Sequence, residues 1–141
     1  MRGLLIAPDM ELWTTTYLRG QLALLGEDVQ VSNKEPTNLG LPLRKPLVVV
    51  RDDSGPRRSH VTFDRSIGVS VLAGTKTNDQ PANDLARLVA AILTDPIIVS
   101  APDSPIAAVT WDGCNGPYAV TDALDVARRY LTVQYTIVGD F

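Results

Sequence analysis

Residues 65–93 read RSIGVSVLAGTKTNDQPANDLARLVAAIL, and this stretch decides the fold class. Its first part alternates between positions that hold most of the apolar bulk and positions that hold smaller residues, as a β-strand with one buried face does. The alternating residues are Ile67, Gly68, Val69, Ser70, Val71, Leu72 and Ala73. Turn formers at 74–80 then interrupt the pattern.

The second part of the stretch predicts an amphipathic helix over residues 81–93. Apolar residues recur at i, i+3, i+4 and i+7, which places them on one side of a helix: Leu85, Leu88, Val89 and Ile92. The expected boundary residues are Asn78 or Asp79 at the N-cap, Pro81 in the first turn and Asp95-Pro96 at the end. A strand and a helix with one apolar side each bury those sides on each other, which predicts a sheet covered by a helix.

The rest of the chain predicts a further helix and several strands. The helix is expected over residues 10–25, with Asp9 as N-cap and Gly26 at its end. Strands are expected at 29–31, 46–51, 60–63, 65–73, 97–100, 106–111 and 128–138, with a bulge near 64–65 that could join two of them. Irregular segments are expected at 33–45 and 52–59, a turn cluster at 112–118 and a connection at 119–125.

The order of these elements predicts the fold class. Helices do not alternate regularly with strands, which argues against a doubly wound parallel sheet. The sequence therefore predicts an α+β fold with an antiparallel or mixed β-sheet and helices packed on one face, in a single domain spanning residues 1–141.

Composition narrows the possible functions. The 141 residues are 45% hydrophobic and 21% charged, with a net charge of −3, as in ordinary globular proteins. With one cysteine (Cys114) and one histidine (His60), an intrachain disulfide and a Cys/His metal site are not expected. The apolar run at 3–7 is cut by Pro8 and is too short to span a membrane, so no membrane partner is predicted. Catalytic and cofactor motifs are not recognised, and no cofactor is predicted.

Two acidic residues after a buried strand raise the question of a metal site. Asp52 and Asp53 directly follow the predicted strand at 46–51. Carboxylates at the end of a strand often bind metals or act in phosphoryl transfer. The next residues, Ser54-Gly55-Pro56, make a turn in which aspartate is common for its own backbone hydrogen bonds. The turn interpretation is favoured over metal binding.

Basic residues form the other candidate surfaces. Arg57 and Arg58 at a hairpin tip could face DNA phosphates or an acidic partner, although a solvated loop is the simpler interpretation. A second pair, Arg128-Arg129, begins the last strand and could discourage edge-to-edge pairing. The interface or lumen candidates are Arg51, Asp52, Asp53, Arg57, Arg58, His60, Lys76, Arg128 and Arg129.

The order of parts resembles the tail-terminator (tail-completion) proteins of bacteriophages with long non-contractile tails, particularly those of actinobacterial phages. An N-terminal helix precedes PLVVVRDDSGPRR (46–58) and HVTFDRSIGVSVLAGT (60–75). TNDQPANDLARLVAAIL (77–93) then forms a helix, and GPYAVTDALDVARRYLTVQYTIVG (116–139) leads into a terminal strand. The resemblance spans nearly the whole chain.

The resemblance implies a non-enzymatic structural protein of the virion. Such a subunit is small and α+β, and it assembles into a ring, typically a hexamer, on the head-proximal end of the tail tube. The expected partners are further copies of the chain, the major tail tube protein and a head-completion or neck protein. Genomic DNA is expected to pass through the ring lumen without being read. Assembly in the host cytoplasm and a final position at the tail–head junction follow from the resemblance.

Other functions remain open at this point. The chain could be another neck protein, such as a head–tail stopper or adaptor. From a different class, it could be a small metal-dependent α+β enzyme that uses Asp52 or Asp53, or a small-molecule-binding domain with a closed apolar pocket.

Overall fold

Two twelve-residue strands, β3 (Thr62–Ala73) and β6 (Ala127–Val138), pair antiparallel over their whole length and form the centre of the sheet. The computed structural model, which describes residues 3–140, places four further strands around them. On one side, β2 (Leu47–Asp52) pairs antiparallel with β3, and β1 (Gln30–Ser32) pairs parallel with β2. On the other side, β4 (Ile106–Val109) and β5 (Asn115–Val120) pair with the two halves of β6. The sheet is therefore mixed, as predicted.

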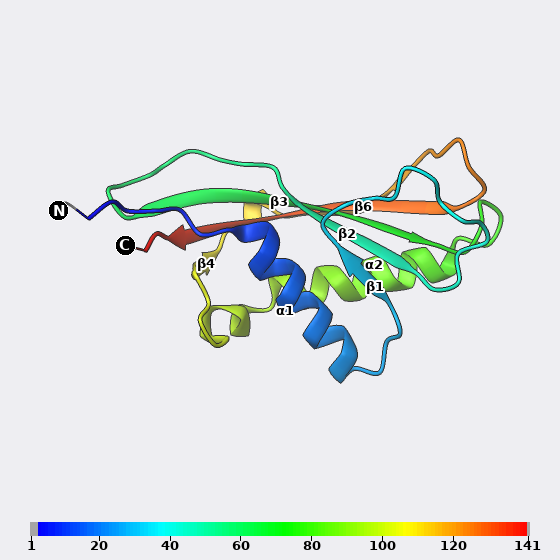
Figure 1. Ribbon diagram of the computed structural model, residues 1–141, viewed down its shortest axis with the longest axis horizontal. Coiled ribbons are helices and arrows are strands. Elements are labelled where there is room, and N and C mark those ends of the chain that lie inside the picture. The colour runs from blue at the N-terminus through cyan, green and yellow to red at the C-terminus, as the bar shows by residue number, and fades with distance from the viewer. Residues whose placement is uncertain (1–2, 141) are drawn as a thin grey trace.

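Both α-helices cover the same face of this sheet. Figure 1 shows α1 (Met10–Leu24) and α2 (Gln80–Thr94) on one side of the strands, and buried residues of both belong to one core with the strands. The α2 contribution is Leu85, Ala86, Val89 and Leu93, close to the predicted stripe. The helix α1 begins where expected, because the Asp9 carboxylate accepts a hydrogen bond from the Leu12 N–H. The predicted α+β class, with helices on one face, is confirmed.

The opposite face of the sheet is partly covered by one irregular segment, residues 33–45, which we call the strap. Parallel strands need a crossover connection, and the strap makes that connection from the end of β1 to the start of β2. Its leucines, Leu39, Leu41 and Leu43, pack on a small second core made of Leu47, Leu72 and Val126. The prediction of an irregular segment here is correct, and its apolar residues explain why it lies on the sheet.

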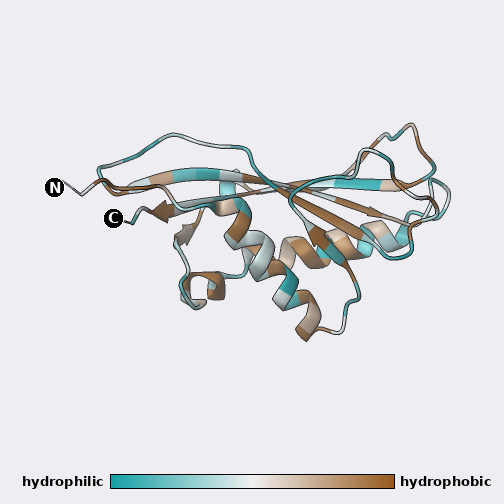
Figure 2. Cartoon of the chain, in the orientation of Figure 1, coloured by the Kyte–Doolittle hydropathy of each residue, from teal (hydrophilic) through white to brown (hydrophobic). Residues whose placement is uncertain are grey.

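The molecule is elongated along β3 and β6 and has two different ends (Figure 1). At one end residues 53–58 continue alongside β3, so that β2 and β3 form a long hairpin with its tip at 59–61. The first and last described residues lie at this hairpin end, where Ile6 and Asp140 exchange two backbone hydrogen bonds. The strap and the loop before β6 lie at the other end, which we call the strap end. Figure 2 shows alternating hydrophilic and hydrophobic bands along the central strands, as expected for faces of different polarity.

The structure corrects four local predictions. Residues 97–100 lie in a 3-10 helix, η1 (Pro96–Ser100), because Asp95 caps its first turn and proline suits its first position. A second 3-10 turn, η2 (Trp111–Gly113), and β5 replace the predicted turn cluster and part of the connection at 119–125. His60 lies in the exposed turn and not in a strand, and β3 runs from Thr62 through 64–65 without a shift in register.

Candidate functional site

The nine predicted interface residues do not form one surface, because the structure places them in three regions. Arg51, Asp52 and Asp53 lie at the end of β2, near the middle of the molecule. Arg57, Arg58 and His60 lie at the hairpin end, whereas Lys76, Arg128 and Arg129 lie at the strap end. Each region therefore has to be considered by itself.

Two residues of the middle region, Arg51 and Asp53, belong to a polar cluster on the face opposite the helices, which we call the open face. The Arg51 guanidinium donates to Asp53 Oδ1 at 2.9 Å and to the Tyr130 hydroxyl at 3.1 Å. The same hydroxyl donates to Asp53 Oδ2 at 2.8 Å, which closes a triangle of side chains. The cluster lies over Gly68, where a Cβ atom would come within 2.0 Å of the Tyr130 hydroxyl oxygen. Glycine at this position is thus needed to make room for the cluster.

The electrostatics of this cluster keep Tyr130 protonated and Arg51 charged. Burial, followed by the hydrogen bond to Asp53, raises the pKa of Tyr130, so the phenol stays protonated. The hydrogen bond with Tyr130 is the largest contribution that raises the pKa of Arg51, which stays charged. A phenol with a raised pKa and a permanently charged guanidinium are poor general bases at neutral pH. The cluster is suited to hold the surface in shape rather than to transfer protons.

The two carboxylates proposed for metal binding point to different faces of the sheet. Asp52 follows Val50 on the helix-covered face, where its carboxylate lies 3.8 Å from the Arg65 guanidinium and accepts from the Ser54 N–H. Asp53 belongs to the open face. Within residues 3–140, no group of three or more His, Cys, Asp or Glu side chains is placed to hold a metal ion.

The arginines of the hairpin end fasten the hairpin to itself. Arg58 forms an ion pair with the nearly buried Asp64, at 2.5 Å. Arg57 donates to the carbonyl oxygens of Ser59 and His60 and lies over the Phe63 ring at 5.0 Å. These contacts indicate a structural role for both arginines, in addition to any role at the surface.

The arginines of the strap end hold the strap and the β5–β6 loop. Arg128 donates two hydrogen bonds to Glu35 of the strap, at 2.8 and 3.0 Å, and one to Asp122. The neighbouring Arg129 donates a hydrogen bond to the Asp79 carboxylate at the start of α2. The Asp79 side chain does not cap the helix, contrary to the prediction. A backbone N–H from Leu124, and also Arg128, lower the pKa of Asp122.

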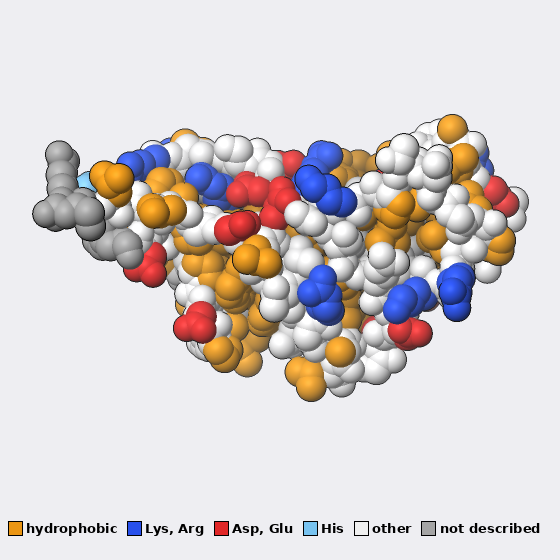
Figure 3. Space-filling view, viewed as in Figure 1, with side chains coloured by type: hydrophobic (Ala, Val, Ile, Leu, Met, Phe, Trp, Pro, Cys, Tyr) orange, Lys and Arg blue, Asp and Glu red, His pale blue; other side chains and the backbone are white. Residues whose placement is uncertain are grey.

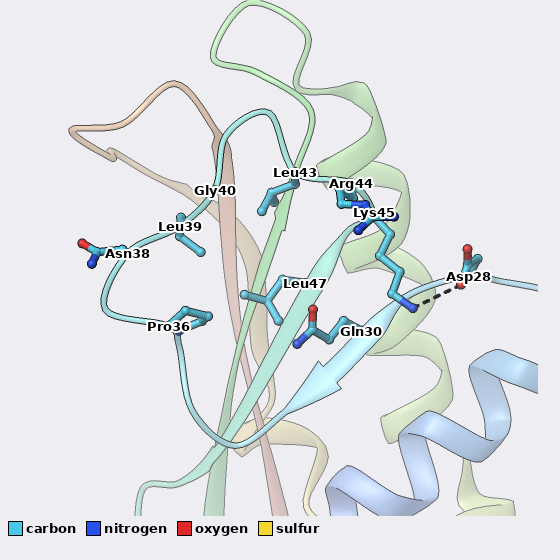
Figure 4. Close-up of a pocket in the computed structure, with 10 residues that line it drawn as sticks. All are labelled: Asp28, Gln30, Pro36, Asn38, Leu39, Gly40, Leu43, Arg44, Lys45 and Leu47. Carbon is cyan, nitrogen blue, oxygen red and sulfur yellow. Dashed lines mark ion pairs between the residues drawn. The ribbon is translucent and has the colours of Figure 1, made fainter.

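A hollow lies between the strap and the sheet (Figure 4). Its volume is about 560 Å³, and Figure 4 shows Pro36, Leu39 and Leu43 around it, with Leu47 and Gln30 of the sheet beneath. The Lys45 ammonium reaches across one side to Asp28 at 3.5 Å. This hollow is open and of mixed polarity, unlike the closed apolar pocket expected of a small-molecule-binding domain.

Sequence reasoning missed two residues that build these regions. Tyr130 is not among the predicted interface residues, yet its hydroxyl belongs to the polar cluster; the alternation of Tyr130, Thr132 and Gln134 along β6 was the available signal. Glu35 is the strap residue that binds Arg128, and nothing local in the sequence indicates this pairing.

Comparison with known proteins does not add a family. No protein-family model matches the chain, and no curated protein matches it significantly. In the described part of the chain, no helix is both long and apolar enough to cross a membrane.

Proposed function

We propose that this chain is a phage tail terminator, which assembles as a ring on the head-proximal end of the tail tube. The ring, a hexamer as the resemblance implies, stops polymerisation of the tube protein and joins the tail to a neck protein. Genomic DNA passes through its lumen without sequence recognition. The proposal combines the resemblance of the sequence with the α+β fold that the resemblance implies.

The observation that carries the proposal is the open face. Helices cover one face of the sheet, whereas the middle of the other face holds a polar cluster in which Arg51, Asp53 and Tyr130 bind one another. Charged groups that are already paired give a stiff, wet contact surface, since they need little reorganisation when a partner binds. Such a surface supports a role in assembly better than a role in catalysis.

The hairpin fits the same role. It extends the sheet beyond the helices at the end where residues 4–7 and 139–140 lie (Figure 1), and it is stiffened by the Arg58–Asp64 pair. A stiff projection can reach a neighbouring subunit or the tube. In a ring, each such contact is repeated by symmetry, so weak contacts add up.

The test is electron microscopy of particles made by a phage that lacks this gene. We expect tails of abnormal length, or unjoined tails beside DNA-filled heads. Unjoined tails of normal length would favour the neck-protein alternative. Tails of normal length that are already joined to heads would refute both.

A further inference from the structure

An apolar groove runs beside the first turns of α1, near the hairpin end. We call it the α1 groove; its volume is about 660 Å³, and its lining includes Pro8, Leu12, Trp13, Asp103, Pro105 and Val138. Figure 3 shows hydrophobic side chains gathered at the lower left of the molecule, where the first turns of α1 and the segment after α2 lie in Figure 1.

The surface around this groove is unusually apolar for one that faces solvent. Leu12 is 66% exposed and Val138 is 41% exposed. Ile97 and Val99 of η1 are also exposed, and the Ser104 hydroxyl ties the loop at 103–105 to the carbonyl of Ile98 between them. Exposed apolar side chains gathered at a groove are candidates for a site of interaction.

The chain also carries an apolar segment that matches such a groove. Residues 3–7, which we call the arm, contain no charge, and Leu4 and Ile6 are 71% and 66% exposed. The two backbone bonds between Ile6 and Asp140 hold the arm in place, Leu5 and Ala7 pack against the core, and the side chains of Leu4 and Ile6 face solvent. Since the arm and the α1 groove are both exposed in the same molecule, they do not cover each other within one chain.

Charged residues lie beside both surfaces. Asp9, Asp103 and Asp140 line the α1 groove, and Asp140 is also the backbone partner of Ile6 in the arm. The hairpin tip lies beside the arm, because Val61 accepts a hydrogen bond from Gly139, the residue before the arm's partner. Among the described residues, Arg57 at this tip bonds to carbonyl oxygens and forms no ion pair, so no carboxylate beside it offsets its charge.

We infer that the α1 groove binds the arm of a second copy of this chain. The apolar side chains of Leu4 and Ile6 fill the groove, and Arg57 of the same copy approaches Asp103 at its rim. The contact joins two different patches, so each added copy leaves one groove and one arm free. Contacts of this head-to-tail type close into a ring when the rotation between copies permits. The inference rests on the proposed function and identifies the contact between ring subunits.

The test is sedimentation velocity of the purified protein over a wide range of concentration. Leu12→Gln alters the groove and Ile6→Gln alters the arm, and both keep the volume of the side chain. Each should weaken self-association about tenfold or more, because an apolar contact worth about 1.4 kcal/mol or more is lost. A mixture of the two variants should form dimers and no larger species. The intact groove of the Ile6→Gln variant binds the intact arm of the Leu12→Gln variant, and the two surfaces left over are both altered.

Two further variants sharpen the result. Leu24→Gln, at an 81% exposed position at the far end of the same helix, should assemble as the wild type does. Asp103→Asn removes the rim charge but tolerates the positive φ of 57° at this position, and should reduce the salt dependence of assembly. A wild type that stays monomeric at every concentration, or Leu12→Gln and Ile6→Gln variants that assemble normally, would overturn the inference. Neither result touches the tail-terminator proposal, whose test is made on whole particles.

Discussion

Tyr135 is the residue through which β6 holds the end of α2, and removing its hydroxyl should destabilise the fold. The side chain is fully buried, and the hydroxyl donates to the Leu93 carbonyl at 2.5 Å. This carbonyl is in the last turn of α2, where carbonyl groups lack partners within the helix. Tyr135→Phe keeps the ring and its packing but leaves a buried carbonyl unpaired, which should cost about 1–3 kcal/mol.

That cost can be converted into a decrease in melting temperature. A chain of 141 residues has an unfolding entropy of roughly 0.3 kcal/mol per degree near its midpoint, so the variant should melt about 3–10 °C below the wild type. Urea unfolding should show the same loss with an unchanged slope, because the surface exposed on unfolding is the same.

The control for this prediction is Tyr118→Phe. Tyr118 is 51% exposed and packs edge-on against Tyr130, so its hydroxyl can bond to water in either state. This control should melt within about a degree of the wild type. If Tyr135→Phe also unfolds like the wild type, the Leu93 carbonyl has another partner and the reasoning about this contact is wrong.

Three other changes test separate parts of the fold and the candidate site. Val89→Asp puts an unpaired charge in the core under α2, where Val89 is fully buried, and should lower the free energy of unfolding by about 3 kcal/mol or more, measured by urea unfolding. Gly68→Val should displace Tyr130 from the polar cluster and cost about 1–2 kcal/mol, and a crystal structure of the variant should show the phenol moved; an unmoved phenol would contradict the steric argument. The pKa of Asp122 is lowered in the folded state, so this group stabilises the protein above its ordinary value of 3.8 and the contribution is lost as the pH falls through the folded value. Asp122→Asn should therefore be less stable than the wild type at neutral pH, by up to about 1 kcal/mol, with the difference vanishing in acid; a difference that persists in acid would point to packing instead.

The long elements could be predicted because their patterns are local. In β6 the odd residues Leu131, Val133, Tyr135 and Ile137 are all buried, as the alternation predicts. The stripe on α2 was equally readable. Hydrophobic periodicity and helix capping depend on residues that are close in sequence, so both can be recognised without knowing the tertiary structure.

The strand β5 could not be predicted because its pairing is not local. Gly116-Pro117 favours a turn by its own chemistry, and Gly116 does adopt a positive φ of 87°. The free edge of β6 nevertheless pairs with residues on both sides of this dipeptide, and a register shift between Asn115 and Tyr118 accommodates it. Pairing with a long neighbouring strand outweighs local turn propensity here.

The polar cluster shows the same limit at a candidate site. Asp53 was recognised as a candidate from its place after a strand and Arg51 from its charge, but their partner Tyr130 lies more than seventy residues away. Its position over Gly68 depends on the register of β3 against β6, which pairs Gly68 with Thr132. Register is set by packing over the whole sheet, so the composition of either strand alone does not specify it.

The pairing of charges within the chain has a consequence for assembly. Most arginines that were candidates for binding partners are in ion pairs with carboxylates of the same chain: Arg51, Arg58, Arg128 and Arg129. An arginine that is already paired gives little net attraction to a distant partner, since its field is largely cancelled. The surfaces left for strong binding are then the apolar ones, chiefly the α1 groove and the arm, with Arg57 adding direction.

Assembly driven by burial of apolar surface should strengthen on warming near room temperature and show a negative heat-capacity change, because this burial produces both effects. Calorimetric dilution of the assembled protein measures this directly; a heat-capacity change near zero, with strong weakening by salt, would mean that charges and not apolar contacts hold the copies together.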